Sequence, residues 1–554
     1  MSLKKKVCVS VLYALLAMIL VWPSLNNFFT SSDYVHIEKC SVEKPIDVLS
    51  PFFTSWRGDF DEYNWKYWGA KTDLYRPLPR FLLTIEKLLY GFNPFGYHVV
   101  NAVLYWLCAI LVFILARSLR CETLCSLAAG ILFLLHPSHI YSLMCISSQK
   151  ELLFTLWGLL TVIMWIRFRE NPSNRRLISA SIIYALAFLT KESGLGLLAI
   201  VIFYDLLLAS RKKERPDIAS WAYFALVTAV YIVIRTSFFG SIGGYLDMPI
   251  TLRSLLIGLR SATYRMWFNP GYYLNVSFIK LFMIVFFITV LAYMHSHKKP
   301  VWLPVCIAGF YFGLGPAVCS FYQSLLCFPI AFFCIAICRL TFSFWKQNRF
   351  FFTSLILFLV FMISVWIPVW IEAGGEMKDA SKVSETIFND LKNKDFSEGY
   401  APEEISIYYL FLPDALSKYG YVFRNGVGSA TRLALGSEDV NVYLLSLIGS
   451  RGGPTVLSGL GLLSREPFSI YMKSGLLSQF DFPQFPYWKL DEGDIIENRY
   501  EIIEIHKKSR YIREIKVTLL DNPFLEGGRI PVFLYYNGTD IDKLDFDNLK
   551  KVQN

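Results

Sequence analysis

Apolar runs long enough to cross a membrane recur through the first 371 residues of the chain. A helix needs roughly 20 apolar residues to span a bilayer core of about 30 Å. On this criterion the pattern predicts eleven transmembrane helices, near residues 7–28, 97–116, 122–136, 151–166, 177–190, 194–208, 218–234, 281–295, 301–318, 321–338 and 350–371. The third and fifth runs are short, so each could instead form a re-entrant or buried helix.

The charges between these runs predict the orientation of the chain. If the basic N-terminus at residues 4–6 is cytoplasmic, all the short basic loops fall on the cytoplasmic face, as the positive-inside rule requires. The excess of 54 Lys and Arg over 44 Asp and Glu then belongs to cytoplasmic loops and does not indicate nucleic-acid binding. The first loop, residues 30–96, and the tail from residue 372 are predicted to lie outside.

The composition excludes an ordinary soluble, fibrous or disordered protein, because 54% of the residues are hydrophobic and only 18% are charged. We therefore predict an α-helical polytopic membrane protein, with a transmembrane domain in residues 1–371 and an extracytoplasmic soluble α+β domain in residues 372–554. Apolar residues at spacings of three and four in residues 78–89 predict an amphipathic helix in the membrane interface, and residues 252–267 form a second candidate.

The tail contains short runs typical of strands, broken by Gly, Pro, Asn and Asp. We predict strands at 405–412, 421–423, 440–447, 512–520 and 530–536, and helices at 383–393 and 429–435. No cysteine follows Cys338, so the tail is not stabilised by disulfides. Cys40 and Cys145 alone lie where a disulfide outside the cytoplasm could form.

Asp33 is the candidate catalytic base. It follows the first apolar run in the sequence TSSDYVHI, which places its carboxylate at the depth of the lipid head groups. A base at this depth could deprotonate an acceptor hydroxyl beside the phosphate of a lipid-linked donor. The alternative is an aspartate that caps a turn, which position alone favours.

Other ionisable residues near the ends of the spans are candidates for binding substrate. Arg76, in YRPLP, could hold a phosphate through its guanidinium fork or could contact lipid head groups. Lys191 and Glu192, in FLTKESG, could hold a phosphate or pair with other charges. Arg260 could contact an anionic head group or be an ordinary cation of the membrane surface.

His136 and His139, in HPSH, are spaced to reach one metal ion. No Cys, Asp or Glu accompanies them at ligand spacing, so polar histidines at a helix end are the favoured interpretation. No cofactor is predicted with certainty, and a divalent metal stays an open alternative. The sequence has no phosphate-binding glycine loop, nucleophile elbow or zinc-protease signature, which disfavours hydrolases and nucleotide-driven pumps.

Three stretches together resemble the polytopic GT-C glycosyltransferases. The similar branch is that of the protein O-mannosyltransferases and the transmembrane tetratricopeptide-repeat O-mannosyltransferases, with their bacterial relatives. The stretches are YRPLPRFLLTIEKLLYGFNPFGYHVVNAVLYWL, ILFLLHPSHIY and ALAFLTKESGLGLLAIVIFYDLLL, and the resemblance covers roughly residues 33–208. Their order and spacing are more specific than any single motif.

This resemblance implies an inverting hexosyl- or mannosyltransferase with no tetratricopeptide repeats. The enzyme would move a sugar from a polyprenyl- or dolichyl-phosphate donor to a protein or glycan acceptor on the outer face of the membrane. Asp33 would be the general base, and Arg76 and Lys191 would contact the donor phosphate or support the site. The segment PDALSKYGYVFRNGVGSATRLALG resembles the tails of some bacterial membrane proteins of this type, which favours a bacterial inner membrane.

The chain departs from the family pattern at three places. Where the family often has two adjacent acids, this chain has Ser32 and Asp33, and Tyr141 replaces an acidic residue after the His-Pro-x-His motif. Near the tenth predicted span, this chain has Gln323 and Ser324 where the family usually has an Asp-Arg-Tyr stretch. The alternative is therefore a non-catalytic, degenerate GT-C-like protein that binds or moves polyprenyl-linked sugars.

Overall fold

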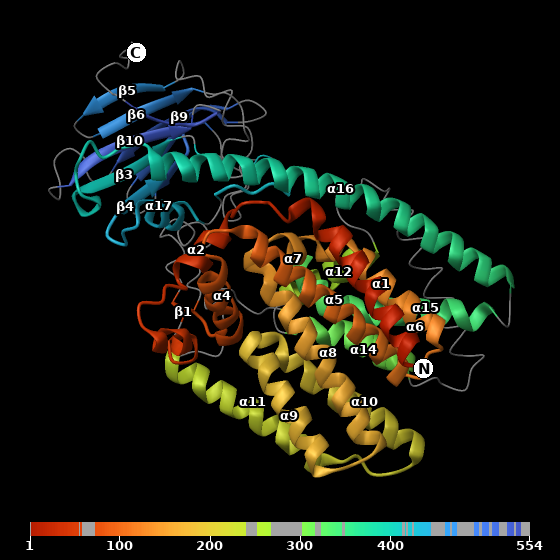
Figure 1. Cartoon of the computed structure of the whole chain (residues 1–554). Coiled ribbons are helices and arrows are strands. Elements are labelled where there is room, and N and C mark those ends of the chain that lie inside the picture. Colours follow the sequence, from red (N-terminus) through yellow and green to blue (C-terminus); the bar gives the residue numbers. More distant parts are fainter. Residues whose placement is uncertain are drawn as a thin grey trace.

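Helices form the first part of the chain and two sheets lie in its C-terminal part (Figure 1). The structure is a computed structural model. It describes residues 2–54, 56–57, 73–239, 252–267, 302–315, 323–345, 349–410, 412, 416, 419–423, 426–444, 460–465, 468–473, 492–497, 501–508, 512–519, 529–536 and 539–544.

The helices of the bundle follow the apolar runs closely. The long ones are α1 (Leu3–Val21), α5 (Pro94–Ser118), α6 (Thr123–Leu135), α8 (Gln149–Glu170), α9 (Asn174–Thr190), α10 (Leu195–Lys212), α11 (Ile218–Phe239), α14 (Trp302–Gly313), α15 (Cys327–Trp345) and α16 (Arg349–Asn393). The short helices α2 (Ser32–Glu38) and α7 (Ile140–Met144) lie between them, with single 3-10 turns that include η3 (Pro137–His139), η4 (Ile146–Ser148) and η5 (Glu192–Gly194).

Within the described ranges, seven helices are long and apolar enough to cross a membrane. The pair at Thr123–Leu135 and Pro137–Met144, bent by 49°, raises the number to eight, and this bend agrees with the open interpretation of the third run. The protein is therefore an integral multi-pass membrane protein. The predicted span at 281–295 lies outside the described residues, α9 and α14 have only 17 and 12 residues, and the count of eleven stays a prediction.

Helices form at both predicted places, as α4 (Pro77–Tyr90) and α12 (Leu252–Trp267), and their position in the membrane interface stays a prediction. Prolines occupy the first turn of α4, where a missing N–H costs nothing, and Gly91 with φ of 56° ends the helix. Leu88 and Leu89 remain 57% and 68% exposed, so the apolar face of α4 is uncovered at its C-terminal end.

The tail has a mixed sheet and an antiparallel sheet. The mixed sheet has the order β11-β10-β3-β4, with β3 (Ile405–Leu410), β4 (Asn441–Leu444), β10 (Ile530–Tyr536) and β11 (Ile541–Lys543). Helix α17 (Val427–Leu435) connects the parallel strands β3 and β4. The antiparallel sheet has the order β5-β6-β9-β8-β7, with β5 (Leu460–Arg465), β6 (Phe468–Lys473), β7 (Ile495–Glu497), β8 (Glu501–Lys508) and β9 (Ile512–Leu519).

Most of the elements predicted for the tail are present, but the strand predicted at 421–423 is wrong. This segment lies against the loop after α1, which is predicted to lie outside and which we call the first outside loop. The carbonyl oxygen of Val422 accepts a hydrogen bond of 2.7 Å from the N–H of Ser31 in that loop. Its apolar residues are buried because a loop covers them, and periodicity cannot distinguish this burial from that of a strand. The helix predicted at 383–393 is the end of α16, which runs from the bundle to the sheets (Figure 1).

The tail and the first outside loop share one apolar core. Phe29, Tyr34 and Ile37 of the loop pack with Phe388 of α16 and Phe423 of the tail. The ring of Tyr34 stacks between the other two rings, with centroids 5.8 Å from Phe388 and 5.9 Å from Phe423. The predicted division into domains at residue 371 stays a prediction, and α16 continues through it.

A buried ion pair also connects these two parts. Arg432 of α17 donates from Nε to Glu38 of α2 at 2.5 Å, and the hydroxyl of Ser429 donates to the same carboxylate at 2.6 Å. Burial raises the pKa of Glu38, but the hydrogen bonds and charge of Arg432 leave it below the ordinary value. The carboxylate is therefore charged at neutral pH and holds α17 against α2.

Ser31 precedes Asp33 in an unusual backbone conformation. Its φ of 50° and ψ of −125° are unfavourable for a residue with a side chain, at a cost of roughly 1–3 kcal/mol. The hydrogen bond to Val422 holds this conformation, and Gly426 packs directly on the Ser31 carbonyl oxygen. The tail thus fixes the backbone on the N-terminal side of Asp33.

Replacing Gly426 with alanine should destabilise this contact by about 1–3 kcal/mol, because the new Cβ would overlap the Ser31 carbonyl oxygen. Thermal unfolding of the purified protein in detergent measures the effect. Gly375→Ala is the matched control, since nothing lies within 4 Å of a Cβ at that position. Equal unfolding temperatures for the two variants would show that the tail does not rest on Ser31.

Candidate active site

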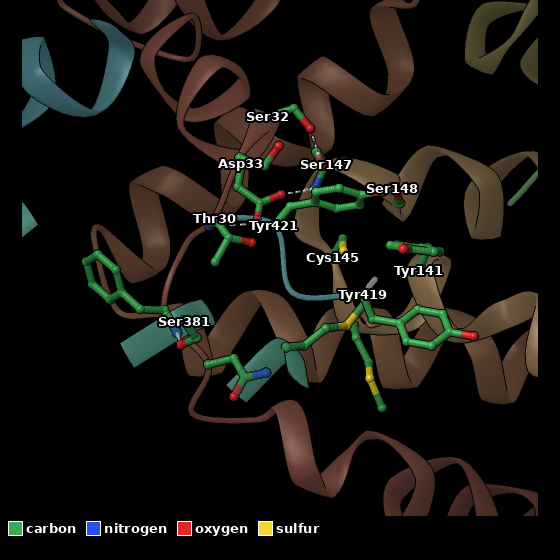
Figure 2. A pocket seen from close by; sticks show the side chains of 15 residues that line it. Thr30, Ser32, Asp33, Tyr141, Cys145, Ser147, Ser148, Ser381, Tyr419 and Tyr421 are labelled. Carbon is green, nitrogen blue, oxygen red and sulfur yellow. Dashed lines mark hydrogen bonds between the residues drawn. The ribbon is translucent and has the colours of Figure 1, made fainter. Parts of the chain in front are cut away.

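The carboxylate of Asp33 is held by backbone N–H groups from two segments. Ser147, in η4, donates to Oδ1 at 2.7 Å, and Thr30 donates to Oδ2 at 3.2 Å (Figure 2). The hydroxyl of the adjacent Ser32 donates to the Ser147 hydroxyl at 2.9 Å. These contacts fix the Asp33 carboxylate relative to the start of α8.

Asp33 is 3% exposed, and burial is the largest influence on its charge. Burial raises the pKa of Asp33 above the ordinary value, although the N–H groups of Ser147 and Thr30 act in the opposite direction. A carboxylate with a raised pKa is a stronger proton acceptor than an exposed aspartate. The role of Asp33 as a base stays a prediction.

Asp33 lines a pocket of about 350 Å³ between the bundle and the tail. Three segments contribute most of the wall: the first outside loop, residues 141–148, and residues 419–421 of the tail with part of α16 (Figure 2). Most of the lining side chains carry a hydroxyl, an aromatic ring or a sulfur atom. Among the lining residues, Asp33 is the only one with a charge.

A group of buried charges surrounds the start of α8 and η5. Arg76, at the start of α4, forms a two-pronged ion pair with Glu192, with 3.0 Å from Nε to Oε2. Lys191 contacts Glu151 at 2.5 Å, and both side chains are almost fully buried. Arg235, at the end of α11, is also buried and close enough to Glu192 to interact with its charge. We call Arg76, Lys150, Lys191, Arg235, Glu151 and Glu192 the charged cluster.

In the described part of the chain, Lys150 gives the charged cluster an ammonium group that forms no ion pair, although it is close enough to Glu151 and Glu192 to interact with their charges. It lies in the first turn of α8, three residues after Ser147, and is half-buried. Within the described residues, its Nζ makes no hydrogen bond or ion pair. Among the described residues, the cluster thus contains four cations and two carboxylates, and Lys150 is its candidate for contact with an anion.

His36 connects Asp33 with the charged cluster. It lies one helical turn after Asp33 in α2, and its Nδ1 donates to the Ser32 carbonyl oxygen at 2.7 Å. Burial, with the positive charges of Lys150 and Arg76, holds the pKa of His36 well below its usual range. His36 is therefore neutral and adds no charge between the carboxylate and the cations.

The two histidines of HPSH lie elsewhere, in the bundle core. The Nε2 of His136 donates to the Met266 carbonyl oxygen at 3.0 Å, and Nδ1 accepts from the Ser138 N–H at 3.2 Å. The Nδ1 of His139 lies 3.2 Å from the Cys327 sulfur. No group of three or more His, Cys, Asp or Glu side chains suited to a metal ion occurs in the described part of the chain.

The structure brings some of the predicted residues together and separates others. Asp33 lies in the pocket, and Arg76, Lys191 and Glu192 lie in the charged cluster. Arg260 is exposed on α12 and does not line the pocket. Cys40 and Cys145 are both free thiols.

Sequence reasoning did not select Lys150, Glu151 or Arg235. The sequence did indicate them, because each is an ionisable residue at the end of a predicted span. Placing an ionisable side chain there costs free energy, so such residues usually have a function. Tyr419 and Tyr421 gave no comparable signal. They reach the pocket through the tail, and nothing local in the sequence indicates that contact.

Residues 76–238 match the family described as "Dolichyl-phosphate-mannose-protein mannosyltransferase". The predicted resemblance to the protein O-mannosyltransferase branch is confirmed. The matched segment contains the whole charged cluster, while Asp33 precedes it.

The curated relatives match this chain over a limited part of their length. "Protein O-mannosyl-transferase Tmtc1" of Drosophila melanogaster is 31% identical over 133 residues, which are 24% of this chain and 16% of the relative. Tmtc2 of the same organism is 30% identical over 187 residues, 31% of this chain and 19% of the relative. This chain therefore matches less than a fifth of each.

A solved structure also aligns with this chain. ArnT from Cupriavidus metallidurans, crystallised with undecaprenyl phosphate, is 11% identical with a TM-score of 0.44. The alignment covers 78% of this chain and 85% of ArnT.

Proposed function

We propose that this protein is a glycosyltransferase that moves a sugar from a polyprenyl-phosphate donor to an acceptor hydroxyl, with Asp33 as the general base. The observation that carries the proposal is the position of Asp33, a buried carboxylate that lines a pocket and lies near a cluster with excess positive charge. The family resemblance of residues 76–238 supports the same reaction class and a mannosyl or related hexosyl group.

The reaction can be written from these residues. The Asp33 carboxylate accepts the proton of the acceptor hydroxyl while the acceptor oxygen bonds to the anomeric carbon of the sugar. The bond between that carbon and the phosphate oxygen breaks, and its electron pair leaves with the lipid phosphate. A single displacement of this kind inverts the anomeric configuration.

The charged cluster supports the leaving group in this scheme. Lys150 offers its ammonium group directly, while Arg76 and Lys191 are held in place by Glu192 and Glu151. Charge develops on the lipid phosphate in the transition state, and fixed cations in a water-poor site stabilise such charge strongly. We place the reaction on the extracytoplasmic face of a bacterial inner membrane, which the distribution of basic loops and the bacterial type of tail support.

Replacing Asp33 with asparagine should lower sugar transfer by roughly 10²- to 10⁴-fold, the usual contribution of general acid–base catalysis. The amide keeps the size of the side chain but cannot accept the proton. Released lipid phosphate measures turnover with a panel of polyprenyl-phosphate sugars, and a separate assay measures donor binding, which should largely survive. Unchanged turnover would remove Asp33 as the base, and a wild type inactive with every donor would favour the non-catalytic alternative.

The pH dependence of kcat/KM should report the raised pKa of Asp33. Asp33 must be deprotonated to act, so the rate should fall as pH decreases through its pKa. This decrease is the acidic limb of the pH profile, and its midpoint should lie above about 3.9, the pKa of an unperturbed aspartate. The residual activity of Asp33→Asn is the control, because it should lack that limb. A limb at or below the unperturbed value would contradict the buried setting of the carboxylate.

Replacing Lys150 with glutamine should weaken donor binding by roughly 10- to 100-fold, as expected for the loss of a charged hydrogen bond. Lys150→Arg should retain more of the affinity because it keeps the charge. Lys392→Gln, on the exposed face of α16, is the matched control. Binding of a polyprenyl phosphate in nanodiscs measures the effect. Equal affinities for Lys150→Gln and the control would place the phosphate elsewhere.

A further inference from the structure

We propose that the pocket beside Asp33 is a saccharide-binding site and that tail residues 419–423 form one of its walls. We call these residues the strap. The inference rests on the proposed function, because it assumes that Asp33 acts on a hydroxyl held in this pocket.

The strap is fixed at two points. The N–H of Tyr419 donates to the Glu376 carboxylate of α16 at 2.8 Å, and the Val422 carbonyl oxygen accepts from Ser31 at 2.7 Å. Phe423 packs into the core shared by the loop and the tail. The tyrosines of the strap are therefore anchored parts of the wall.

Aromatic rings from both parts of the protein meet at the pocket. The ring of Tyr141, from α7, lies 5.9 Å from that of Tyr419 and 6.3 Å from that of Tyr421, measured between centroids. The planes of Tyr141 and Tyr421 differ by only 27°. Figure 2 shows the three tyrosines around the same space as Asp33. They give the pocket apolar ring faces with hydroxyl groups at their edges.

The other lining groups define the ligand class. Thr30, Ser32, Ser148 and Ser381 add hydroxyls, and among the lining residues no cation is present. An anionic ligand group has no partner here, whereas neutral hydroxyls can donate to and accept from these side chains. A sugar ring has C–H faces and a rim of hydroxyls, which complement aromatic faces and a hydroxyl-rich wall.

The size of the pocket also favours a sugar over a peptide segment. Its volume of about 350 Å³ lies at the lower end of the range of about 300–1,000 Å³ for small-molecule sites. The cations lie instead in the charged cluster, so the phosphate and the saccharide occupy different surroundings. Asp33 lines the pocket, and His36, one helical turn after it, is close enough to Lys150 and Arg76 of the charged cluster to interact with their charges.

A saccharide in this pocket could be the sugar of the donor or part of a glycan acceptor. The test uses the full-length protein in nanodiscs and measures binding of methyl hexosides, a polyprenyl-phosphate hexose and a polyprenyl phosphate without sugar. Tyr421→Ala should weaken saccharide binding roughly tenfold and leave binding of the sugar-free lipid unchanged. Tyr419→Ala should act in the same direction. Tyr400→Ala, an exposed tyrosine that does not line the pocket, is the matched control.

The ligands distinguish the two sources. Weaker binding of the polyprenyl-phosphate hexose alone assigns the pocket to the donor sugar. Weaker binding of free hexosides, with a higher KM for a glycan acceptor and an unchanged KM for the donor, assigns it to the acceptor.

If Tyr421→Ala does not fold, Tyr421→Leu keeps the bulk of the side chain, removes the ring, and should give the same loss.

Two results would overturn the proposal. In the first, binding of the free hexosides and of the polyprenyl-phosphate hexose is in each case absent or equal in the wild type and the tyrosine variants. In the second, a Ser- or Thr-containing peptide binds in a tyrosine-dependent manner and neither saccharide ligand does. The proposed function is tested separately. Tyrosine-dependent saccharide binding without sugar transfer would reject the transferase and keep the saccharide site. Asp33-dependent transfer with tyrosine-independent binding would reject only the saccharide site.

Discussion

The hydrogen bonds between the Asp33 carboxylate and the N–H groups of Ser147 and Thr30 are the interaction on which the site depends. A buried carboxylate is costly unless it is hydrogen-bonded, and these two donors come from segments far apart in the sequence. One lies just before α8 and the other just after α1. The position of Asp33 therefore requires that the first outside loop and the bundle meet in one arrangement.

The charged cluster also contains buried charges, and most of them are paired with an opposite charge. Arg76 with Glu192 and Lys191 with Glu151 lower the cost of burying four ionised groups, because each charge has an opposite partner. The pairs also leave their cations rigidly placed at the start of α4 and η5. Lys150 adds a half-buried cation in this rigid setting. Paired charges that hold the frame and one cation open to a ligand suit the recognition of a phosphate.

The tail contributes to the site as well as to the fold. Its strap and Gly426 contact Ser31, whose backbone conformation is unfavourable and sits two residues before Asp33. The shared core and the ion pair between Glu38 and Arg432 offset the cost of that conformation. A tail that only extended from the membrane would leave the backbone around Asp33 without this support. Its two tyrosines also complete a wall that the bundle alone does not close.

The sequence by itself determined the membrane character, most of the helices, including the two amphipathic ones α4 and α12, and most of the tail strands. These features follow from local patterns, since apolar length, helical spacing and alternation are properties of neighbouring residues. The sequence also selected Asp33, Arg76, Lys191 and Glu192, because ionisable side chains near a membrane are rare without a role. The roles assigned to those four residues stay predictions.

Only the tertiary structure decided which of these residues share a site. It separated His136, His139 and Arg260 from the pocket, because the histidines use their ring nitrogens in the core and Arg260 faces outward. It showed that Lys150 is close enough to Arg76 to interact with its charge. It also showed that residues 421–423, predicted as a strand, belong to the strap. These outcomes depend on contacts such as that between Ser31 and Val422, which join residues nearly 400 positions apart. No local pattern in the sequence records such a contact, because it forms only when separate segments pack together.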